Sequence, residues 1–292
     1  MDGAMEVGVA LPSTVRDTSG DALVEWAAEA DRAGFSSLAT LGRLVYDNYD
    51  GIVALSAAAA VTERAKLVTA ILLSPLHGNA ALLAKQAASL DRLSGGRLVL
   101  GLAAGARPDD FTAAGVPMKG RGTLLEEQIT EARAIWAGER RGFAGGIGPV
   151  PATRGGPPIM LGGHSPKAIE RAARLADAWI SGGGGVEMFK GGAAAFRAAC
   201  AAAGREKPAK VVALTYFALG PHADELADQY LSDYYGFAPP YAQMVLRGSA
   251  IGADRLRETL SRLAEAGCDE VLLAPCASGL DQLKELREFL GR

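Results

Sequence analysis

The chain has 292 residues, of which 49% are hydrophobic and 22% are charged, and its formal net charge is −3. This composition excludes an intrinsically disordered chain, and the small negative charge excludes a strong basic field for nucleic acid or anionic lipid. A chain of this length folds as one large domain or two ordinary ones. From its charge we expect the chain to bind a small molecule and neither nucleic acid nor a membrane.

Short apolar runs alternate with helical sequence along the chain. Eight runs suit buried parallel strands: 7–11, 35–41, 67–73, 98–102, 159–161, 179–181, 211–217 and 270–274. Helical patterns run from about 21 to Gly34, at about 52–63, 80–93, 124–137 and 166–176, and as leucine stripes at 256–263 and 283–290. Insertions near 139–157 and 220–248 interrupt the alternation. This order predicts the α/β class and a single (β/α)8 TIM barrel over residues 1–292, with a doubly wound sheet as the rival.

The insertion at 220–248 is rich in aromatic residues. It contains Phe237 and four of the seven tyrosines of the chain, Tyr230, Tyr234, Tyr235 and Tyr241. A long insertion at a barrel mouth often closes over the active site, and flat rings would suit a flat ligand. Tyrosine and phenylalanine are also common at subunit interfaces, so a lid and a dimer contact both stay open.

The start of the chain and its cysteines bear on the compartment. Residues 1–6 are acidic and lack the basic region of a signal peptide, and no apolar run reaches the roughly 20 residues that span a bilayer. Cys200, Cys268 and Cys276 are odd in number and widely spaced, which fits neither a disulfide framework nor a zinc site. We therefore expect a cytoplasmic protein that binds no metal ion.

The C-terminal ends of the strands are where a barrel of this kind builds its active site. Gly162, Gly163 and His164 lie between a strand and a helix that Ser165 can cap. Free backbone amides and the helix dipole at such a turn suit an anion, so a phosphate site and an ordinary turn are the two interpretations. Four glycines at 182–185, after the next strand, indicate either a close ligand or a mobile loop.

Few side chains qualify for proton transfer or charge stabilisation. His77 follows the third strand on the active face and is a candidate proton carrier, and Arg43 follows the second strand, where it could stabilise negative charge. An exposed surface position is the alternative for both residues. The chain contains no Gly-x-Ser-x-Gly elbow, no His-Glu-x-x-His pair and no dinucleotide-binding G-x-G-x-x-G fingerprint.

Several segments closely resemble the bacterial-luciferase-like oxidoreductases. They occur in the family's order and cover most of residues 7–181 and the last strand: LLAKQAASLDRLSGGRL at 82–98, GLAAGARPDDF at 101–111, GVP at 115–117, IMLGG at 159–163, LADAW at 175–179 and AGCDE at 266–270. The resemblance implies a (β/α)8 barrel that binds F420 or reduced FMN at its C-terminal face. Such enzymes transfer hydride to a small organic substrate or insert oxygen into it. Because the cofactor carries the redox chemistry, the lack of an acid–base pair fits this family.

The resemblance also implies where the cofactor binds. The family often bends strand three with a bulge and a non-proline cis peptide against the cofactor ring, and the matching stretch here is Ala70, Ile71 and Leu72. The sequence leaves the isomer of that bond open. At the ends of the neighbouring strands we expect further cofactor contacts from Leu41, Gly105, Ala106, Gly162, Gly163, His164, Ser181 and Gly182, of which the last five would hold the phosphate.

Departures from the family pattern bear on the choice of cofactor. Many F420-dependent members end strand two with an Asp-His pair, where this chain has Gly42 and Arg43, and some carry an acid near the place of Ala106. The luciferase itself grips the FMN phosphate with an arginine after strand four and a Glu-Ser pair after strand five. This chain has Ala104 and a Gly-Gly pair there. The glycine pair is closer to the F420-dependent members, so we favour F420 over FMN.

Two other functions stay open. The missing Asp-His pair would suit a flavin-binding barrel without turnover, and a glycine-lined anion site would suit a phosphate-handling isomerase or aldolase. The latter needs a lysine or carboxylate at a strand end, but Lys66 and Lys210 lie at strand starts. We expect a homodimer, and no segment identifies the substrate or decides between monooxygenation and hydride transfer.

Overall fold

Parallel strands close into a barrel in the computed structural model, which describes residues 4–143, 145–205 and 209–292. The barrel strands are β1 (Glu6–Ala10), β2 (Ser37–Thr40), β3 (Lys66–Thr69), β5 (Leu98–Ala103), β6 (Ile159–Gly162), β7 (Ala178–Ser181), β8 (Lys210–Ala218) and β10 (Glu270–Pro275). Neighbours in this order pair in parallel, and β10 pairs with both β8 and β1, which closes the ring. The predicted (β/α)8 barrel is confirmed, and the doubly wound sheet is wrong.

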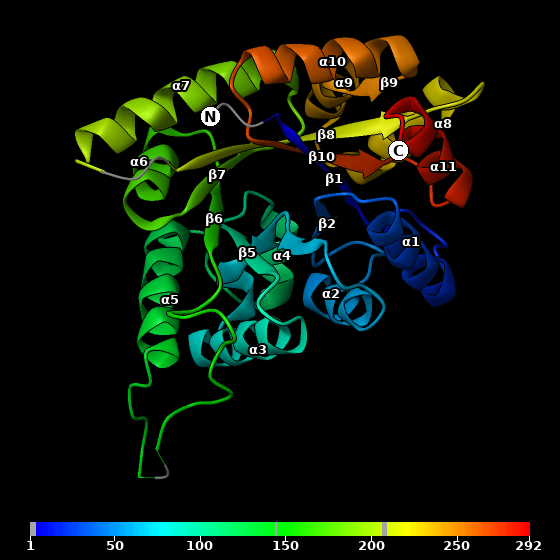
Figure 1. The fold of residues 1–292 in the computed structure, drawn as a ribbon. Helices are drawn as coiled ribbons and strands as arrows, with labels where there is room; N and C mark the ends of the chain where they lie inside the picture. The colour runs from blue at the N-terminus through cyan, green and yellow to red at the C-terminus, as the bar shows by residue number, and fades with distance from the viewer. Residues whose placement is uncertain (1–3, 144, 206–208) are drawn as a thin grey trace.

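Helices surround the strands on the outside of the barrel (Figure 1). They are α1 (Gly20–Arg32), α2 (Gly51–Ala60), α3 (Ala80–Leu93), α4 (Pro108–Ala114), α5 (Arg121–Trp136), α6 (Pro166–Leu175), α7 (Gly185–Ala202), α8 (Ala223–Tyr234), α9 (Pro239–Gly248), α10 (Ala253–Glu265) and α11 (Leu280–Phe289), with a 3-10 turn, η1, at Ser74–His77. Polar side chains cap several helix starts; Asp50, for example, accepts hydrogen bonds from the first amides of α2. None of the described helices has the length and apolar character needed to cross a membrane.

Two layers of apolar side chains hold the barrel together, because successive residues of a strand point to opposite faces. The outer layer joins the strands to the helices and includes the fully buried rings of Trp26, Trp179 and Phe196. The inner layer fills the barrel with strand residues such as Met160 and Leu272, and it continues into the tyrosines of α8. The interior is therefore packed, and the available space lies at the ends of the strands.

The third barrel strand is interrupted where the sequence predicts one continuous run. Val68 of β3 pairs with Val99, but in the short β4 (Leu72–Leu73) Leu72 pairs with Leu102, so this strand has one residue more than its neighbour β5. Such an extra residue is a β-bulge, which re-aims the backbone. The bulge contains a cis peptide bond between Ala70 and Ile71.

The structure contains helices and a short strand that the sequence pattern does not predict. The helices α4 and α7 are two of them, and the 220–248 insertion consists largely of α8 and α9. A short strand, β9 (Ala250–Ile251), pairs with the end of β8. The other insertion, near 139–157, is an extended loop that projects beyond α3 and α5 (Figure 1).

Candidate functional site

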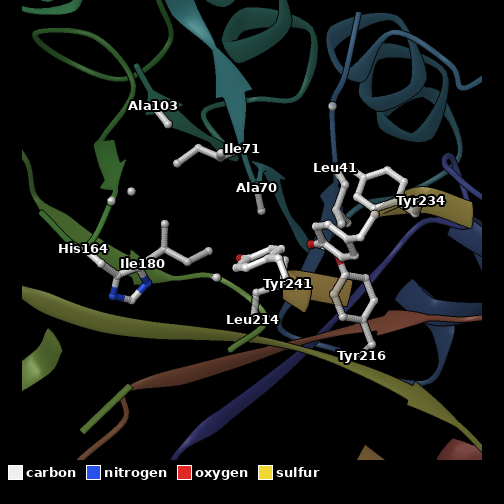
Figure 2. A pocket seen from close by; sticks show the side chains of 16 residues that line it. Leu41, Ala70, Ile71, Ala103, His164, Ile180, Leu214, Tyr216, Tyr234 and Tyr241 are labelled. Carbon is white, nitrogen blue, oxygen red and sulfur yellow. Dashed lines mark hydrogen bonds between the residues drawn. The ribbon is translucent and has the colours of Figure 1, made fainter. Parts of the chain in front are cut away.

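A cavity of about 210 Å³ lies at the C-terminal ends of the strands. Strand ends and the α8–α9 segment provide its lining, which consists of Leu41, Gly42, Ala70, Ile71, Ala103, Gly162, Gly163, His164, Ile180, Gly182, Gly183, Leu214, Tyr216, Tyr234, Tyr235 and Tyr241 (Figure 2). This is the end of the barrel where enzymes of the fold place their active sites. Seven of the predicted cofactor residues line it: Leu41, Ala70, Ile71, Gly162, Gly163, His164 and Gly182.

The bulge provides the apolar wall of the cavity, because Ala70 and Ile71 lie in it. Thr69 holds the bulge against β5: its hydroxyl group donates to the carbonyl oxygen of Gly101 and accepts from the Gly101 amide, both at 2.8 Å. Only glycine fits opposite, since a Cβ at position 101 would lie 1.8 Å from the carbonyl oxygen of Thr69. The two hydrogen bonds between Thr69 and Gly101 thus fix the wall in place.

Free backbone amides gather where β6 and β7 end. No residue that the structure describes accepts a hydrogen bond from the amides of Gly163, His164 or Gly182. Ser165 caps α6 behind them and accepts a hydrogen bond from the amide of Ala168. The positive end of the α6 dipole and three unused donors make this a place for an anion.

The glycines at these strand ends differ in how much space surrounds them. Gly163 has φ 127°, and a Cβ there would lie 2.7 Å from the Cβ of Ala168, so both backbone and packing require glycine. A Cβ at Gly182 would have no neighbour within 4 Å among the described residues. The space beside Gly182 therefore belongs to the cavity rather than to the protein core.

The cavity carries no lysine or arginine in its lining. His164 is the one basic side chain there, and its ring packs edge-on against Trp179 with 5.4 Å between centroids. Partial burial lowers the pKa of His164 below its ordinary 6.5, so the imidazole is neutral at neutral pH. The lining is therefore uncharged under these conditions.

A group of tyrosines covers the cavity from the side of α8 and α9. The hydroxyl oxygens of Tyr216 on β8 and Tyr235 after α8 are 2.7 Å apart. Tyr234 packs edge-on against Tyr235, with 4.9 Å between ring centroids. Burial raises the pKa of all three phenols, so they are neutral at physiological pH. We call residues 223–248 the cover.

Arg43 does not line the cavity. Its guanidinium group donates hydrogen bonds to the carbonyl oxygens of Tyr234 and, at 3.1 Å, of Val45. The same group lies 4.4 Å from the ring centroid of Tyr46, 4.9 Å from that of Tyr234 and 5.6 Å from that of Phe237. Arg43 therefore joins the loop after β2 to the cover, and we call Arg43 with these three rings the clasp. Its predicted role in catalysis stays a prediction.

Two further contacts fasten the cover to neighbouring loops. Arg16 pairs with the carboxylate of Asp233, with 2.7 Å between Nε and Oδ2, and the hydroxyl group of Tyr46 donates to the same carboxylate. The hydroxyl oxygens of Thr14 and Tyr230 are 2.6 Å apart. These contacts come from the loops after β1 and β2, so the cover closes one side of the barrel mouth.

His77, the other predicted catalytic residue, lines a second cavity of about 170 Å³ with Arg43, Asp50 and Leu72. This cavity shares Gly42 with the first one, so the end of β2 separates the two. Burial lowers the pKa of His77 below 6.5, with Asp50 acting in the opposite direction, and the imidazole is neutral at neutral pH. The predicted function of His77 stays a prediction.

Four predicted cofactor residues lie outside the lining of the first cavity: Leu72, Gly105, Ala106 and Ser181. Ser181 is buried and its hydroxyl group donates to the carbonyl oxygen of Gly182 at 3.4 Å. Ala106 is exposed, and Gly105, at φ 80°, packs against Phe111. The cavity is also lined by residues that the sequence does not predict: Ala103, Ile180, Leu214 and Tyr216. Strand alternation identifies such positions only once the direction facing the cavity is known.

The chain matches one protein family by its sequence profile and resembles individual proteins over part of their length. Residues 5–274 match the profile of a family described as luciferase-like monooxygenase. The chain is similar to an uncharacterized protein of Mycobacterium tuberculosis, with 38% identity over 138 residues, 45% of this chain and 47% of that protein. It is also similar to the FMNH(2)-dependent dimethylsulfone monooxygenase of Pseudomonas putida, with 29% identity over 229 residues, 73% of this chain and 62% of that protein. The match thus spans about half to three fifths of these relatives.

A solved structure shares the fold over the whole chain. An F420-dependent secondary alcohol dehydrogenase, in complex with an F420-acetone adduct, superposes with a TM-score of 0.80 over 98% of both chains. Sequence identity is 16%, so this likeness concerns the fold alone.

Proposed function

The chain belongs to the luciferase-like monooxygenase family, and we propose that it is an oxidoreductase that binds F420 or reduced FMN and acts on a small organic substrate. The observation that carries the proposal is one cavity that combines an apolar wall at Ala70 and Ile71 with three free backbone amides. The bound cofactor would supply the hydride or the electrons, while the chain supplies binding, orientation and exclusion of water.

The residues present fit such a cofactor. Ala70 and Ile71 offer a small, uncharged surface for a flat ring system. The amides of Gly163, His164 and Gly182 would hold the phosphate, supported by the positive end of α6. The cover would exclude water from the ring, because Tyr234, Tyr235 and Tyr241 of the cover line the cavity.

Of the two cofactors, F420 has the phosphate whose charge better suits the three amides. Its phosphate is a diester with one negative charge, whereas the monoester of FMN carries close to two at neutral pH. Three amides and a helix terminus suit one charge, and the lining offers neither an arginine nor a lysine for a second. FMN is the second candidate, which the similarity to the FMNH(2)-dependent dimethylsulfone monooxygenase supports.

Titration of the purified chain with F420 and with FMN tests this proposal, with quenching of tryptophan fluorescence as the readout. We expect saturable binding that is tighter for F420. Gly182→Leu should weaken it by more than about tenfold, because the new side chain fills cavity space and meets no protein atom near its Cβ. Position 182 is a cleaner probe than Gly163, whose backbone conformation excludes larger residues.

The matched control is Gly20→Leu, at another glycine with an open Cβ position, which lies on α1 and is not part of the cavity lining. Both variants should melt at the wild-type temperature. An unchanged dissociation constant in Gly182→Leu would show that the cofactor phosphate does not lie beside these amides. Absence of binding for both cofactors would refute the proposed function.

A further inference from the structure

The cavity contains a second set of hydrogen-bonding groups, which the cofactor phosphate would not use. In Figure 2, His164 and Tyr216 lie on opposite sides of the cavity. The hydroxyl group of Tyr216 pairs with that of Tyr235 at 2.7 Å, and both residues belong to the lining. Their rings meet edge-on at 86°, with 6.0 Å between centroids. Packing thus fixes the position of both hydroxyl groups.

The pair has one proton more than its own hydrogen bond uses. Each phenol carries a single O–H and can also accept, so two hydroxyl groups bring two protons and consume one between them. Among the described residues, neither hydroxyl group has another partner within hydrogen-bond distance. Burial raises the pKa of both phenols, so the spare proton stays in place at neutral pH. Tyr216 is fully buried and Tyr235 is half-buried, so the pair offers its spare proton to the cavity through Tyr235.

The remaining side chains around this donor carry no charge at neutral pH. The lining includes the aliphatic groups of Leu41, Ile71, Ile180 and Leu214 and the rings of Tyr234, Tyr241 and His164, and it contains no lysine, arginine, aspartate or glutamate. With the cofactor phosphate on the amides of Gly163, His164 and Gly182, a charged substrate would lose its hydration here without gaining a counter-charge, which is costly. A neutral molecule with one acceptor would satisfy the spare proton and bury its apolar part.

We propose that the Tyr216–Tyr235 hydroxyl pair determines substrate specificity, by donating a hydrogen bond to the oxygen of a neutral, largely apolar molecule such as a ketone, an aldehyde or an alcohol. The inference rests on the proposed function, because it takes the cavity as the place where substrate and cofactor meet. The proposed donor pair excludes carboxylates and phosphorylated molecules as substrates.

Three probes of similar shape test the assignment on the full-length chain, with and without cofactor. Cyclohexanone has the acceptor oxygen, methylenecyclohexane replaces it with carbon, and cyclohexanecarboxylate adds a negative charge. One neutral hydrogen bond should make the ketone bind roughly two- to tenfold more tightly than the alkene, as measured by ligand-detected NMR titration. With the cofactor bound, the carboxylate should bind most weakly. In the double variant Tyr216→Phe/Tyr235→Phe the preference for the ketone should disappear.

The matched control is Tyr49→Phe, which removes an exposed hydroxyl group that donates to the carbonyl oxygen of Thr18, away from the cavity. It should keep the ketone preference. The infrared carbonyl stretch of bound cyclohexanone gives a second readout that needs no variant: donation from a phenol shifts it below its position in hexane.

Several results would overturn the assignment. A ketone preference that survives in the double variant would do so, as would loss of the preference in Tyr241→Phe alone. Carboxylate binding as tight as that of the ketone in the presence of the cofactor would also do so. An unshifted carbonyl stretch in the wild-type protein would also refute it if the double variant fails to fold. If neither F420 nor FMN binds, the proposed function is refuted. The ketone preference is a separate result, because it is also measured without cofactor.

Discussion

Replacing Arg43 with alanine should loosen the cover while leaving the barrel folded. The guanidinium group bonds to the carbonyl oxygen of Tyr234, at the end of α8, and lies over the rings of Tyr46, Tyr234 and Phe237. Two of these three rings belong to the cover, and Arg43 itself follows β2. The substitution thus removes contacts between two segments that are 191 positions apart in sequence and leaves the strands untouched.

The size of the effect follows from these contacts. A hydrogen bond from a charged donor contributes about 1.5–3 kcal/mol, and a cation–π contact near the surface about 0.5–1 kcal/mol. The contributions do not add fully, since the same group makes all of them. The cover also keeps the Arg16–Asp233 and Thr14–Tyr230 contacts. We therefore expect a loss of about 2 kcal/mol for the closed state, which raises the open population roughly 30-fold.

Hydrogen–deuterium exchange measures this opening directly. In Arg43→Ala, peptides from 223–248 should exchange faster by about that factor, while peptides from β1 and β10 keep the wild-type rate. Arg133→Ala is the control, because Arg133 makes a similar bond to a backbone carbonyl, that of Leu175 at 2.6 Å, on another side of the barrel. Wild-type exchange of the cover in Arg43→Ala would refute the assignment of the clasp.

Two further predictions concern the pH range of the cover and the association of the chain. The hydrogen bond from Arg16, with help from Tyr46, holds the pKa of Asp233 below its ordinary 3.8. A carboxyl group whose pKa is lower in the folded than in the unfolded state stabilises the fold at pH values above the unfolded-state pKa. That stabilisation is lost as the pH falls through the folded-state pKa. Exchange of α8, corrected for its intrinsic pH dependence, should therefore accelerate below about pH 4, and Asp233→Asn should abolish that step. The outer face of α2 exposes apolar side chains, including Val53 at 65%, although a helix that is apolar on all sides is normally buried. We expect a homodimer through this face by light scattering and a monomer for Val53→Lys; a monomeric wild type contradicts the prediction.

The strands and most helices could be predicted because their patterns are local. Continuous apolar runs located all eight barrel strands to within a few residues, and α3 begins and ends where periodicity and the following glycines indicate. α7 could not be found in this way, because Gly191 and Gly192 lower its helix propensity. A Cβ at Gly192 would lie 2.3 Å from the ring of Trp179, so tertiary packing requires a residue that propensity disfavours.

The candidate site was predictable where the backbone determines it. Gly162, Gly163 and Gly182 line the cavity because the backbone brings these strand ends together, independently of side-chain conformation. Arg43 also follows a strand end, but a long side chain in a loop takes its direction from its partners. Those partners, Tyr234 and Phe237, come from the other end of the chain, and no local pattern pairs them with Arg43.

The cover both closes the cavity and supplies part of its lining, which ties access to selectivity. The closed cavity of about 210 Å³ is smaller than the roughly 300–1,000 Å³ of most ligand pockets, so a cofactor and a substrate together require the cover to move. Tyr235 follows α8 directly, and its hydroxyl group reaches Tyr216 only while the cover is in place. The strength of the clasp therefore sets how often ligands enter and also how often they meet the donor pair. Arg43→Ala should accordingly speed the association of cyclohexanone. In the same variant, cyclohexanone should also bind with a smaller affinity advantage over methylenecyclohexane. A cover without a recognition group would change the association rate alone.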